Sequence, residues 1–198
     1  MITQNYLDRS MSYGQYQKLV QDLAAQGKTT GSNQDEAYVN YTKLNAQRMH
    51  RLDKTTTLTD ALSDALNNIS SAYVWLVLTE SWCGDAAQNL PVMAIIEKAC
   101  PLIELRLLLR DENLDVMDQY LTGSSRSIPK LICLEKSGLK ELFTWGPRPE
   151  AVQALAMELL AQGASKEDKS LAVQKWYTAD KTLSLQQELL GLVQQHLK

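Results

Sequence analysis

Two short apolar runs on either side of a helical segment constrain the fold of this chain most strongly. Residues 73–79 (YVWLVLT) are almost wholly apolar and rich in β-formers, and a second apolar run covers residues 103–109. A strand that is buried on both faces has this continuous pattern rather than an alternating one. Residues 84–99 between the two runs predict a helix, so the segment 73–109 is expected to form a β-α-β unit.

The following segment continues with alternating strands and helices. Residues 113–121 predict a short helix, and residues 130–135 and 139–144 predict two antiparallel strands joined by the turn Lys136-Ser137-Gly138. Pro149 suits the first turn of a final helix that ends near Gly163. The predicted order of elements over 73–163 is therefore β-α-β-α-β-β-α.

Both ends of the chain have a helical pattern. Ser12 and Gln15 resemble a capping box at the start of one helix, and apolar residues recur at helical spacing in 35–54 and from Leu58 to Ile69. A further apolar stripe follows Ser165. These patterns predict three parts: a helical N-terminal extension over 1–70, an α/β domain over 71–163, and a C-terminal helical extension over 164–198 that packs on that domain.

Composition and charge exclude several classes of protein. Hydrophobic residues make up 44% and charged residues 22% of the 198 residues, as in packed globular proteins. The formal net charge of −3 lacks the basic excess that phosphate-backbone binding requires, so no nucleic-acid partner is expected. No apolar run is long enough to span a membrane, and the first twenty residues do not resemble a secretory signal, so the sequence predicts a cytoplasmic protein without a membrane partner.

No metal or cofactor is expected either. Cys83, Cys100 and Cys133 are too widely spaced for a zinc-ligand pair and do not suggest a disulfide framework. One acidic cluster, 111–118, lacks a nearby His or Cys, and we interpret it as the acidic first turn of a short helix. His50 and His196 lie on flanking helices, which argues against a Cys-His nucleophile pair.

Two motifs indicate a family. The sequence WCGDA (82–86) follows the first predicted strand, and Ile128-Pro129 directly precedes the third. This arrangement resembles the thioredoxin superfamily, in which Trp-Cys-Gly-Pro-Cys begins a helix and an Ile-Pro bond in the cis form faces it. The resemblance covers about half of the chain and implies a thioredoxin-like fold, a central mixed sheet with helices, for residues 71–163. It also implies that Ile128-Pro129 is cis and lies near Cys83.

The chain departs from the family pattern in a consistent way. Ala86 occupies the position of the second redox cysteine, Asp85 replaces the proline, and Val77 stands where thioredoxins have a buried Asp that serves the second cysteine. Dithiol exchange needs two thiols within bonding distance. Cys100 is expected roughly 25 Å away along the helix, and Cys133 roughly 13 Å along a strand from Pro129, so neither replaces the missing thiol.

The resemblance assigns the candidate site. Cys83 is the candidate catalytic residue, and the substrate groove is expected to comprise Trp82, Gly84, Asp85, Ala86, Ile128 and Pro129. The helix N-terminus favours a thiolate at position 83, whereas the carboxylate of Asp85 opposes it. Arg148 and Lys130 could compensate, but we interpret both as exposed cations on loops.

Three functions remain open at this point. The first is a monothiol redox protein. In it, Cys83 exchanges with protein disulfides or takes up glutathione, and a second thiol from solution resolves the mixed disulfide. The second is a non-catalytic binding module. In it, the groove around Cys83 and Pro129 holds an extended peptide by main-chain pairing at Ile128. An iron–sulfur site shared by two chains is a third and weaker idea, because it would need bound glutathione and the sequence has no recognisable pattern for that ligand.

Overall fold

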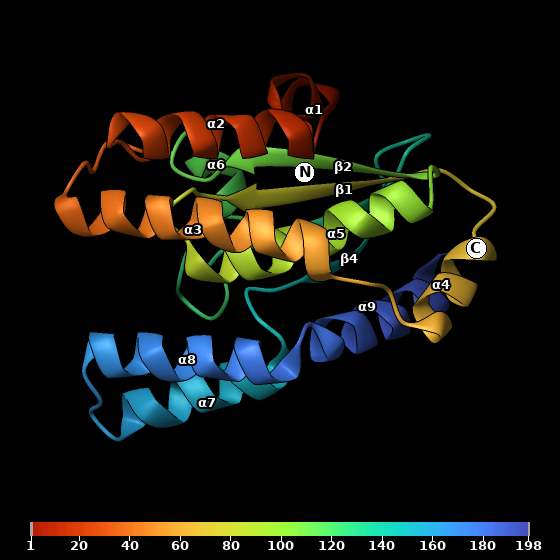
Figure 1. Cartoon of the computed structure of the whole chain (residues 1–198). Helices are drawn as coiled ribbons and strands as arrows, with labels where there is room; N and C mark the ends of the chain where they lie inside the picture. Colours follow the sequence, from red (N-terminus) through yellow and green to blue (C-terminus); the bar gives the residue numbers. More distant parts are fainter. Residues whose placement is uncertain (1, 198) are drawn as a thin grey trace.

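A four-stranded mixed sheet forms the centre of the computed structural model, which describes residues 2–197 (Figure 1). The strand order is β2-β1-β3-β4. Strand β1 (Tyr73–Thr79) pairs in parallel with β2 (Ile103–Leu109) and antiparallel with β3 (Lys130–Glu135). Strand β4 (Glu141–Trp145) pairs antiparallel with β3.

Helices surround this sheet and form pairs among themselves. Helices α2 and α3 pack together, α3 also packs on α5, α4 packs on α9, and α7 pairs with α8 (Figure 1). The helices described are α1 (Gln4–Arg9), α2 (Tyr13–Gln26), α3 (Glu36–Thr55), α4 (Asp60–Asn67), α5 (Gly84–Ala99), α6 (Leu114–Met117), α7 (Glu150–Ala161), α8 (Lys166–Asp180) and α9 (Leu183–His196). The thioredoxin-like order β-α-β-α-β-β-α runs from β1 to α7.

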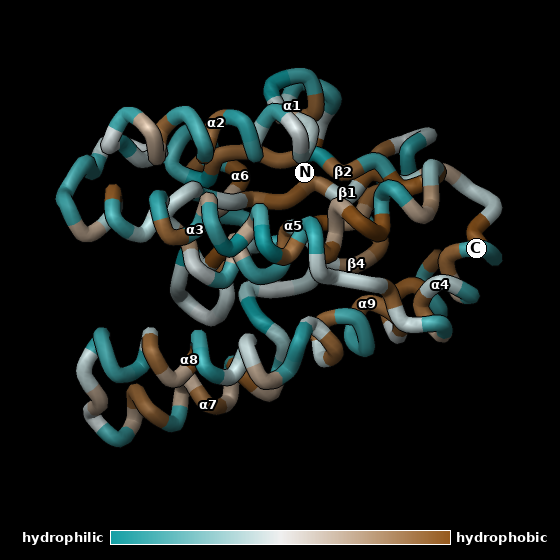
Figure 2. The backbone as a smooth tube through the Cα atoms, viewed as in Figure 1, coloured by the Kyte–Doolittle hydropathy of each residue, from teal (hydrophilic) through white to brown (hydrophobic). Residues whose placement is uncertain are grey.

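The central strand is buried along its whole length because it has a neighbour on each side and helices over both faces. Every residue of β1 is buried, and Trp75 is fully enclosed. Figure 2 shows the hydrophobic residues concentrated in β1 and β2, with hydrophilic residues on the outer sides of the helices. This burial on both faces explains why apolar residues run continuously through 73–79 and do not alternate with polar ones.

One main core includes residues from all three predicted parts of the chain. Tyr16 of α2, Leu62 of α4 and Leu189 of α9 belong to the same cluster of buried residues as the strands. Residues Val152, Ala156, Val173 and Tyr177 form a second, smaller cluster between α7 and α8. The two extensions therefore contribute to the packing of the sheet and are not separate bodies.

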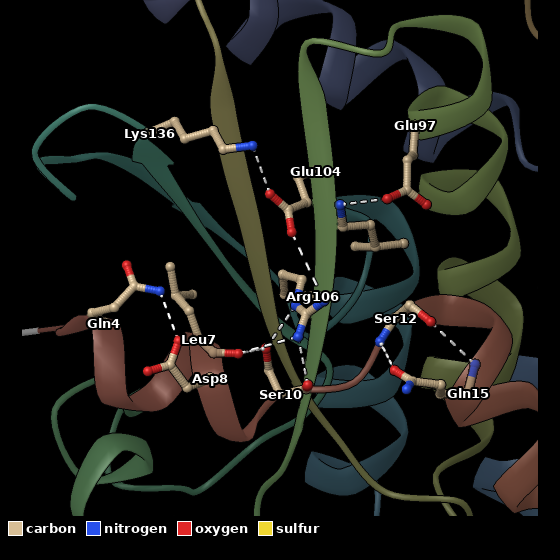
Figure 3. Close-up of polar contacts among 11 residues, drawn as sticks. Gln4, Leu7, Asp8, Ser10, Ser12, Gln15, Glu97, Glu104, Arg106 and Lys136 are labelled. Atoms are coloured by element: carbon tan, nitrogen blue, oxygen red, sulfur yellow. Dashed lines mark hydrogen bonds and ion pairs between the residues drawn. The ribbon is translucent and has the colours of Figure 1, made fainter.

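The N-terminal segment covers the exposed edge of β2. Met11 and Leu107 exchange two backbone hydrogen bonds, each of 2.8 Å. The guanidinium of Arg106 donates hydrogen bonds to the carbonyl oxygens of Leu7 and Ser10 and to the Ser10 hydroxyl (Figure 3). An unpaired strand edge is a site of aggregation, so this contact protects the sheet.

Most predicted elements agree with the structure, and the differences have local causes. The capping box of Ser12 and Gln15 is present at α2 (Figure 3). Strand β4 begins later than expected, at Glu141, because Leu139 has a positive φ of 54° and belongs to the turn. Helix α1 has six residues and no side-chain cap, so its pattern is too short to detect in the sequence.

We predict that Arg106→Met destabilises the protein by about 1–3 kcal/mol, because the charge-assisted hydrogen bonds to the N-terminal segment are lost while the side-chain volume is kept. Urea unfolding measures the change. Lys136→Met is the matched control: Lys136 pairs with Glu104 at the surface, and its loss should cost less than about 1 kcal/mol. Equal effects of the two substitutions would show that Arg106 does not anchor the segment.

Candidate functional site

A cavity of about 490 Å³ opens where β1 ends and α5 begins. Helix α3 provides Tyr38, Tyr41 and Arg48 to its wall, and α8 provides residues on the opposite side. The turn before α5 and the segments 126–128 and 147–148 complete the lining. The cavity therefore lies between the thioredoxin-like sheet and both helical extensions.

Cys83 lines this cavity and is the N-cap of α5. Its side chain is only 7% exposed, and the Sγ–H donates a hydrogen bond to the carbonyl oxygen of Ile128 at 3.2 Å. The Sγ atom also accepts from the backbone N–H of Ala86 at 3.4 Å. The Ile128-Pro129 peptide bond is cis. The two motifs of the sequence thus meet at one sulfur atom, which is held as a neutral thiol.

The surroundings of Cys83 oppose ionisation. Burial, followed by the charge of the Asp85 carboxylate, raises the pKa of Cys83 to about 12. The backbone N–H groups of Ala86 and Asp85 and the charge of Arg148 act in the opposite direction but are weaker. The thiol is consequently protonated at neutral pH and is a poor nucleophile in this conformation.

Asp85 is the centre of a buried polar network. The Nε and Nη2 atoms of Arg148 both lie 2.8 Å from Asp85 Oδ2, and the Tyr177 hydroxyl donates to Asp85 Oδ1 at 3.0 Å. Asn89 donates in turn to the Tyr177 oxygen. Burial, followed by the charge of Asp85, raises the pKa of Tyr177 well above its usual value, so this phenol remains a donor. The network joins α5, the segment before α7, and α8.

A second polar network fixes the turn that precedes Cys83. The Ser81 hydroxyl lies within 3.1 Å of the hydroxyls of Thr29, Thr30 and Thr42. Asn45 of α3, which is fully buried, donates to the Ser81 carbonyl at 2.8 Å. Buried polar groups are costly unless they are paired, so these hydrogen bonds hold the turn in a single position relative to α3.

Trp82, Tyr38 and Arg110 together form one part of the cavity wall. The rings of Tyr38 and Trp82 pack in a T-shaped arrangement with a centroid distance of 5.2 Å. The guanidinium of Arg110 lies 4.8 Å from the centroid of the Trp82 ring, in a cation–π contact. The tryptophan is thus held by neighbours from α3 and from the segment after β2.

The structure brings most of the predicted groove residues together. Trp82, Cys83, Gly84, Asp85 and Ile128 line the cavity. Ala86 and Pro129 are buried and do not line it.

The interpretation of Arg148 and Lys130 as exposed cations on loops is wrong. The side chain of Arg148 is 27% exposed and forms an ion pair with Asp85. Lys130 is 7% exposed, and its ammonium donates to the Gly146 carbonyl. Segment 146–148 packs against the start of β3, so Lys130 is buried and Arg148 is only partly exposed.

Sequence reasoning missed the site residues that come from the extensions. Tyr177 and Gln174 of α8 and Arg48 of α3 lie at the cavity or in its network. One signal was available: Thr42 and Asn45 share the core-facing stripe of α3 with Met49 and are fully buried. Polar residues on an apolar stripe indicate a buried partner elsewhere in the fold.

Three of the four acidic residues in 111–118 have protein partners, and only Asp115 lies in the first turn of α6 (Leu114–Met117). Asp111 pairs with Arg110, Asp118 with Arg126, and Asp115 accepts from the Tyr6 hydroxyl. Within residues 2–197, no group of three or more His, Cys, Asp or Glu side chains is arranged to hold a metal ion. None of the helices described is long and apolar enough to cross a membrane.

Comparison with known proteins decides the family. A family model described as Thioredoxin matches residues 31–168. The chain belongs to the thioredoxin family. No curated protein sequence matches this thioredoxin-family chain.

Two solved structures are similar to this thioredoxin-family protein. A protein of unknown function from Pseudomonas aeruginosa has a TM-score of 0.64 and 19% sequence identity over 98% of each chain. An HIV epitope-scaffold has a TM-score of 0.56 and 22% identity over 93% of this chain and 98% of its own. At these identities the similarity shows the shared fold, including the flanking helices.

We predict that Asp85→Asn accelerates alkylation of Cys83 by iodoacetamide about tenfold at about pH 8. The substitution removes the carboxylate that raises the pKa of Cys83 and frees the charge of Arg148, which lowers it. Both changes increase the thiolate fraction. Peptide mapping by mass spectrometry separates Cys83 from the other two cysteines.

Glu112→Gln is the control for this prediction, since it removes one negative charge at an exposed position outside the cavity. It should leave the rate at Cys83 within about twofold of the wild type. An unchanged rate in Asp85→Asn would show that the carboxylate does not control the thiol.

Proposed function

We propose that this thioredoxin-family protein is a binding protein that takes its ligand in the cavity above Cys83 and does not perform dithiol–disulfide exchange. One observation carries the proposal: Cys83 is a buried, protonated thiol that donates to the Ile128 carbonyl, with alanine at position 86. Exchange requires an accessible thiolate and a resolving thiol. Both conditions are unmet in this conformation.

The other cysteines do not supply the resolving thiol. Cys100 is the C-cap of α5, at the opposite end of the helix that Cys83 begins. Cys133 is fully buried in β3, paired with Trp75 of β1 and Phe143 of β4. Neither side chain lines the cavity.

The position of Ile128 favours a ligand within the cavity over a peptide strand. The Ile128 carbonyl, which main-chain pairing of an extended peptide would use, already accepts one hydrogen bond from Cys83, so a peptide would have to share this oxygen with the thiol. The cavity beside it is large enough for a small molecule.

Monothiol exchange is the second candidate, and the N-cap position of Cys83 favours it. The sulfur accepts the Ala86 N–H, and the charge of Arg148 lowers the pKa of the thiol. In that reaction the deprotonated sulfur attacks one sulfur of a disulfide, and the other sulfur leaves as a thiolate. A small thiol from solution then attacks the mixed disulfide and releases Cys83. The reaction would first require Cys83 to leave its buried position.

We predict that the wild-type protein does not catalyse the reduction of insulin by dithiothreitol above the rate of a Cys83→Ser variant, because no second thiol can release the substrate. Alkylation of Cys83 at about pH 7 should be slower than that of free cysteine by about tenfold or more. Reduction of insulin at a rate that depends on Cys83, or a mixed disulfide with glutathione formed within minutes, would instead support thiol chemistry.

Ala86→Cys tests whether the geometry for a dithiol site is still present. Its side chain would lie three residues after Cys83 on α5, within reach of a disulfide. We expect a linked 83–86 peptide after mild oxidation, with reductase activity that is measurable but poor. The activity should be poor because Val77 is fully buried and has no group that can accept the proton of the new thiol. Formation of intermolecular dimers alone would contradict the assigned geometry.

A further inference from the structure

Positive charge is concentrated around the cavity although the chain as a whole has a formal net charge of −3. Among the residues that line the cavity, Asp85 is the single carboxylate. Six cations accompany it: Arg48, Arg110, Arg126, Arg148, Lys166 and Lys169. The cavity is therefore basic on an otherwise acidic protein, and the low-dielectric walls increase the attraction of anions to it.

Three of these cations already have carboxylate partners. Arg110 pairs with Asp111, Arg126 with Asp118, and Arg148 with Asp85. Within residues 2–197, the side chains of Arg48, Lys166 and Lys169 form no ion pair. Their charges remain available to a ligand.

Arg48 is held in place for this role. Its Nη1 atom donates to Asn45 Oδ1 at 2.8 Å, and Asn45 is itself anchored to the Ser81 carbonyl. Burial is the main cause that lowers the pKa of Arg48, and the like charge of Arg51 contributes next. Asp85 acts on this charge only at longer range, without a direct ion pair. A half-buried cation without an ion pair is costly, and an anion in the cavity would offset this cost.

Donors from two helices converge over the start of α5. A Cβ atom built on Gly84 would lie 3.4 Å from Arg48 Nη1 and 3.3 Å from Gln174 Nε2. The Oε1 atom of Gln174 accepts from Gln88, so its amide nitrogen is the end that faces Gly84. Arg48 of α3 and Gln174 of α8 thus present N–H groups on the same side, at a helix N-terminus.

We propose that the cavity binds a small molecule with at least two negative charges, held between Arg48 on α3 and Lys166 and Lys169 on α8. This inference rests on the proposed binding function and specifies the chemistry of the ligand. Both helices line the cavity, and Figure 1 shows them as separate helices, α3 above α8 in that view. Cations on two separate helices can bind two anionic groups at once. Phosphate and carboxylate both suit the Arg and Lys donors.

The size of the cavity limits the ligand to a small molecule. A volume of about 490 Å³ lies within the range of small-molecule sites. The six cations are confined to the lining of this cavity, and protein carboxylates already neutralise three of them. A site that binds a nucleic-acid backbone has instead an extended basic surface.

Calorimetric titration with two probes tests the proposal at about 20 mM and about 200 mM NaCl. Inorganic pyrophosphate represents phosphate compounds and succinate represents dicarboxylates. We expect saturable binding of at least one probe, with weaker binding at the higher salt concentration. The probe that binds more tightly identifies the source of the negative charges. Failure of both probes to bind at low salt would overturn the proposal.

Matched substitutions on each helix locate the site. Arg48→Gln and Lys169→Gln should each weaken probe binding by about tenfold. Arg51→Gln and Lys175→Gln remove one charge from the same helices outside the cavity lining, and should weaken binding by less than about twofold. Equal losses in all four variants would show that the probes bind by general charge attraction, which contradicts a defined site.

Alkylation of Cys83, measured in the same samples, separates this inference from the proposed function. Slow alkylation together with no probe binding leaves the binding proposal in place and rejects the anionic ligand. Rapid alkylation with Cys83-dependent insulin reduction rejects the proposed function, whatever the outcome of the titration.

Discussion

The partly buried ion pair between Asp85 and Arg148 organises the candidate site. It joins the first turn of α5 to the segment that precedes α7, and the Tyr177 hydroxyl adds α8 to the same carboxylate. Because a buried carboxylate is costly without partners, each of these three elements has one favoured position relative to the others. The pair thereby sets both the shape of the cavity and the electrostatic environment of Cys83.

The same carboxylate opposes the chemistry that the fold usually supports. A thiol at a helix N-terminus gains from the backbone N–H groups, which lower its pKa. At Cys83 this gain is outweighed by burial and by the charge of Asp85. The hydrogen bond to the Ile128 carbonyl further stabilises the protonated form. Cys83 meets the cis Ile128-Pro129 bond, as the family resemblance implies, while the ionised state that exchange requires is disfavoured.

The helical extensions give this site features that the sheet alone would not provide. Helix α3 supplies Asn45 and Arg48, and α8 supplies Tyr177 and the lysines of the cavity wall. Three of the cations at the cavity have no carboxylate partner within the described part of the chain. A cavity that is enclosed by two added helices and lined by such cations suits recognition of a small anion better than exchange with a protein disulfide.

The fold could be predicted from the sequence to a large extent, because its strands are local patterns. Strands β1 and β3 have the predicted bounds, since burial on both faces produces continuous apolar runs. The meeting of Cys83 with the Ile128-Pro129 bond followed from the family resemblance.

The contacts between distant segments could not be predicted in this way. The pairing of Arg148 with Asp85 depends on how the segment before α7 packs against α5, and the role of Tyr177 depends on the position of α8. A single sequence carries no local pattern for such contacts. Asn45 and Thr42, as polar residues on the buried stripe of α3, were the available indication that this helix contributes to the site.

The ionisation of Cys83 tests the central claim most directly. A protein with ¹³Cβ-labelled cysteine can be titrated by NMR, with Cys83→Ser used to assign the resonance. Because the pKa of Cys83 is raised to about 12, the account predicts that its ¹³Cβ shift stays constant between about pH 6 and about pH 10. A titration with a midpoint below about pH 8 would contradict it, since the thiolate would then be accessible near neutral pH.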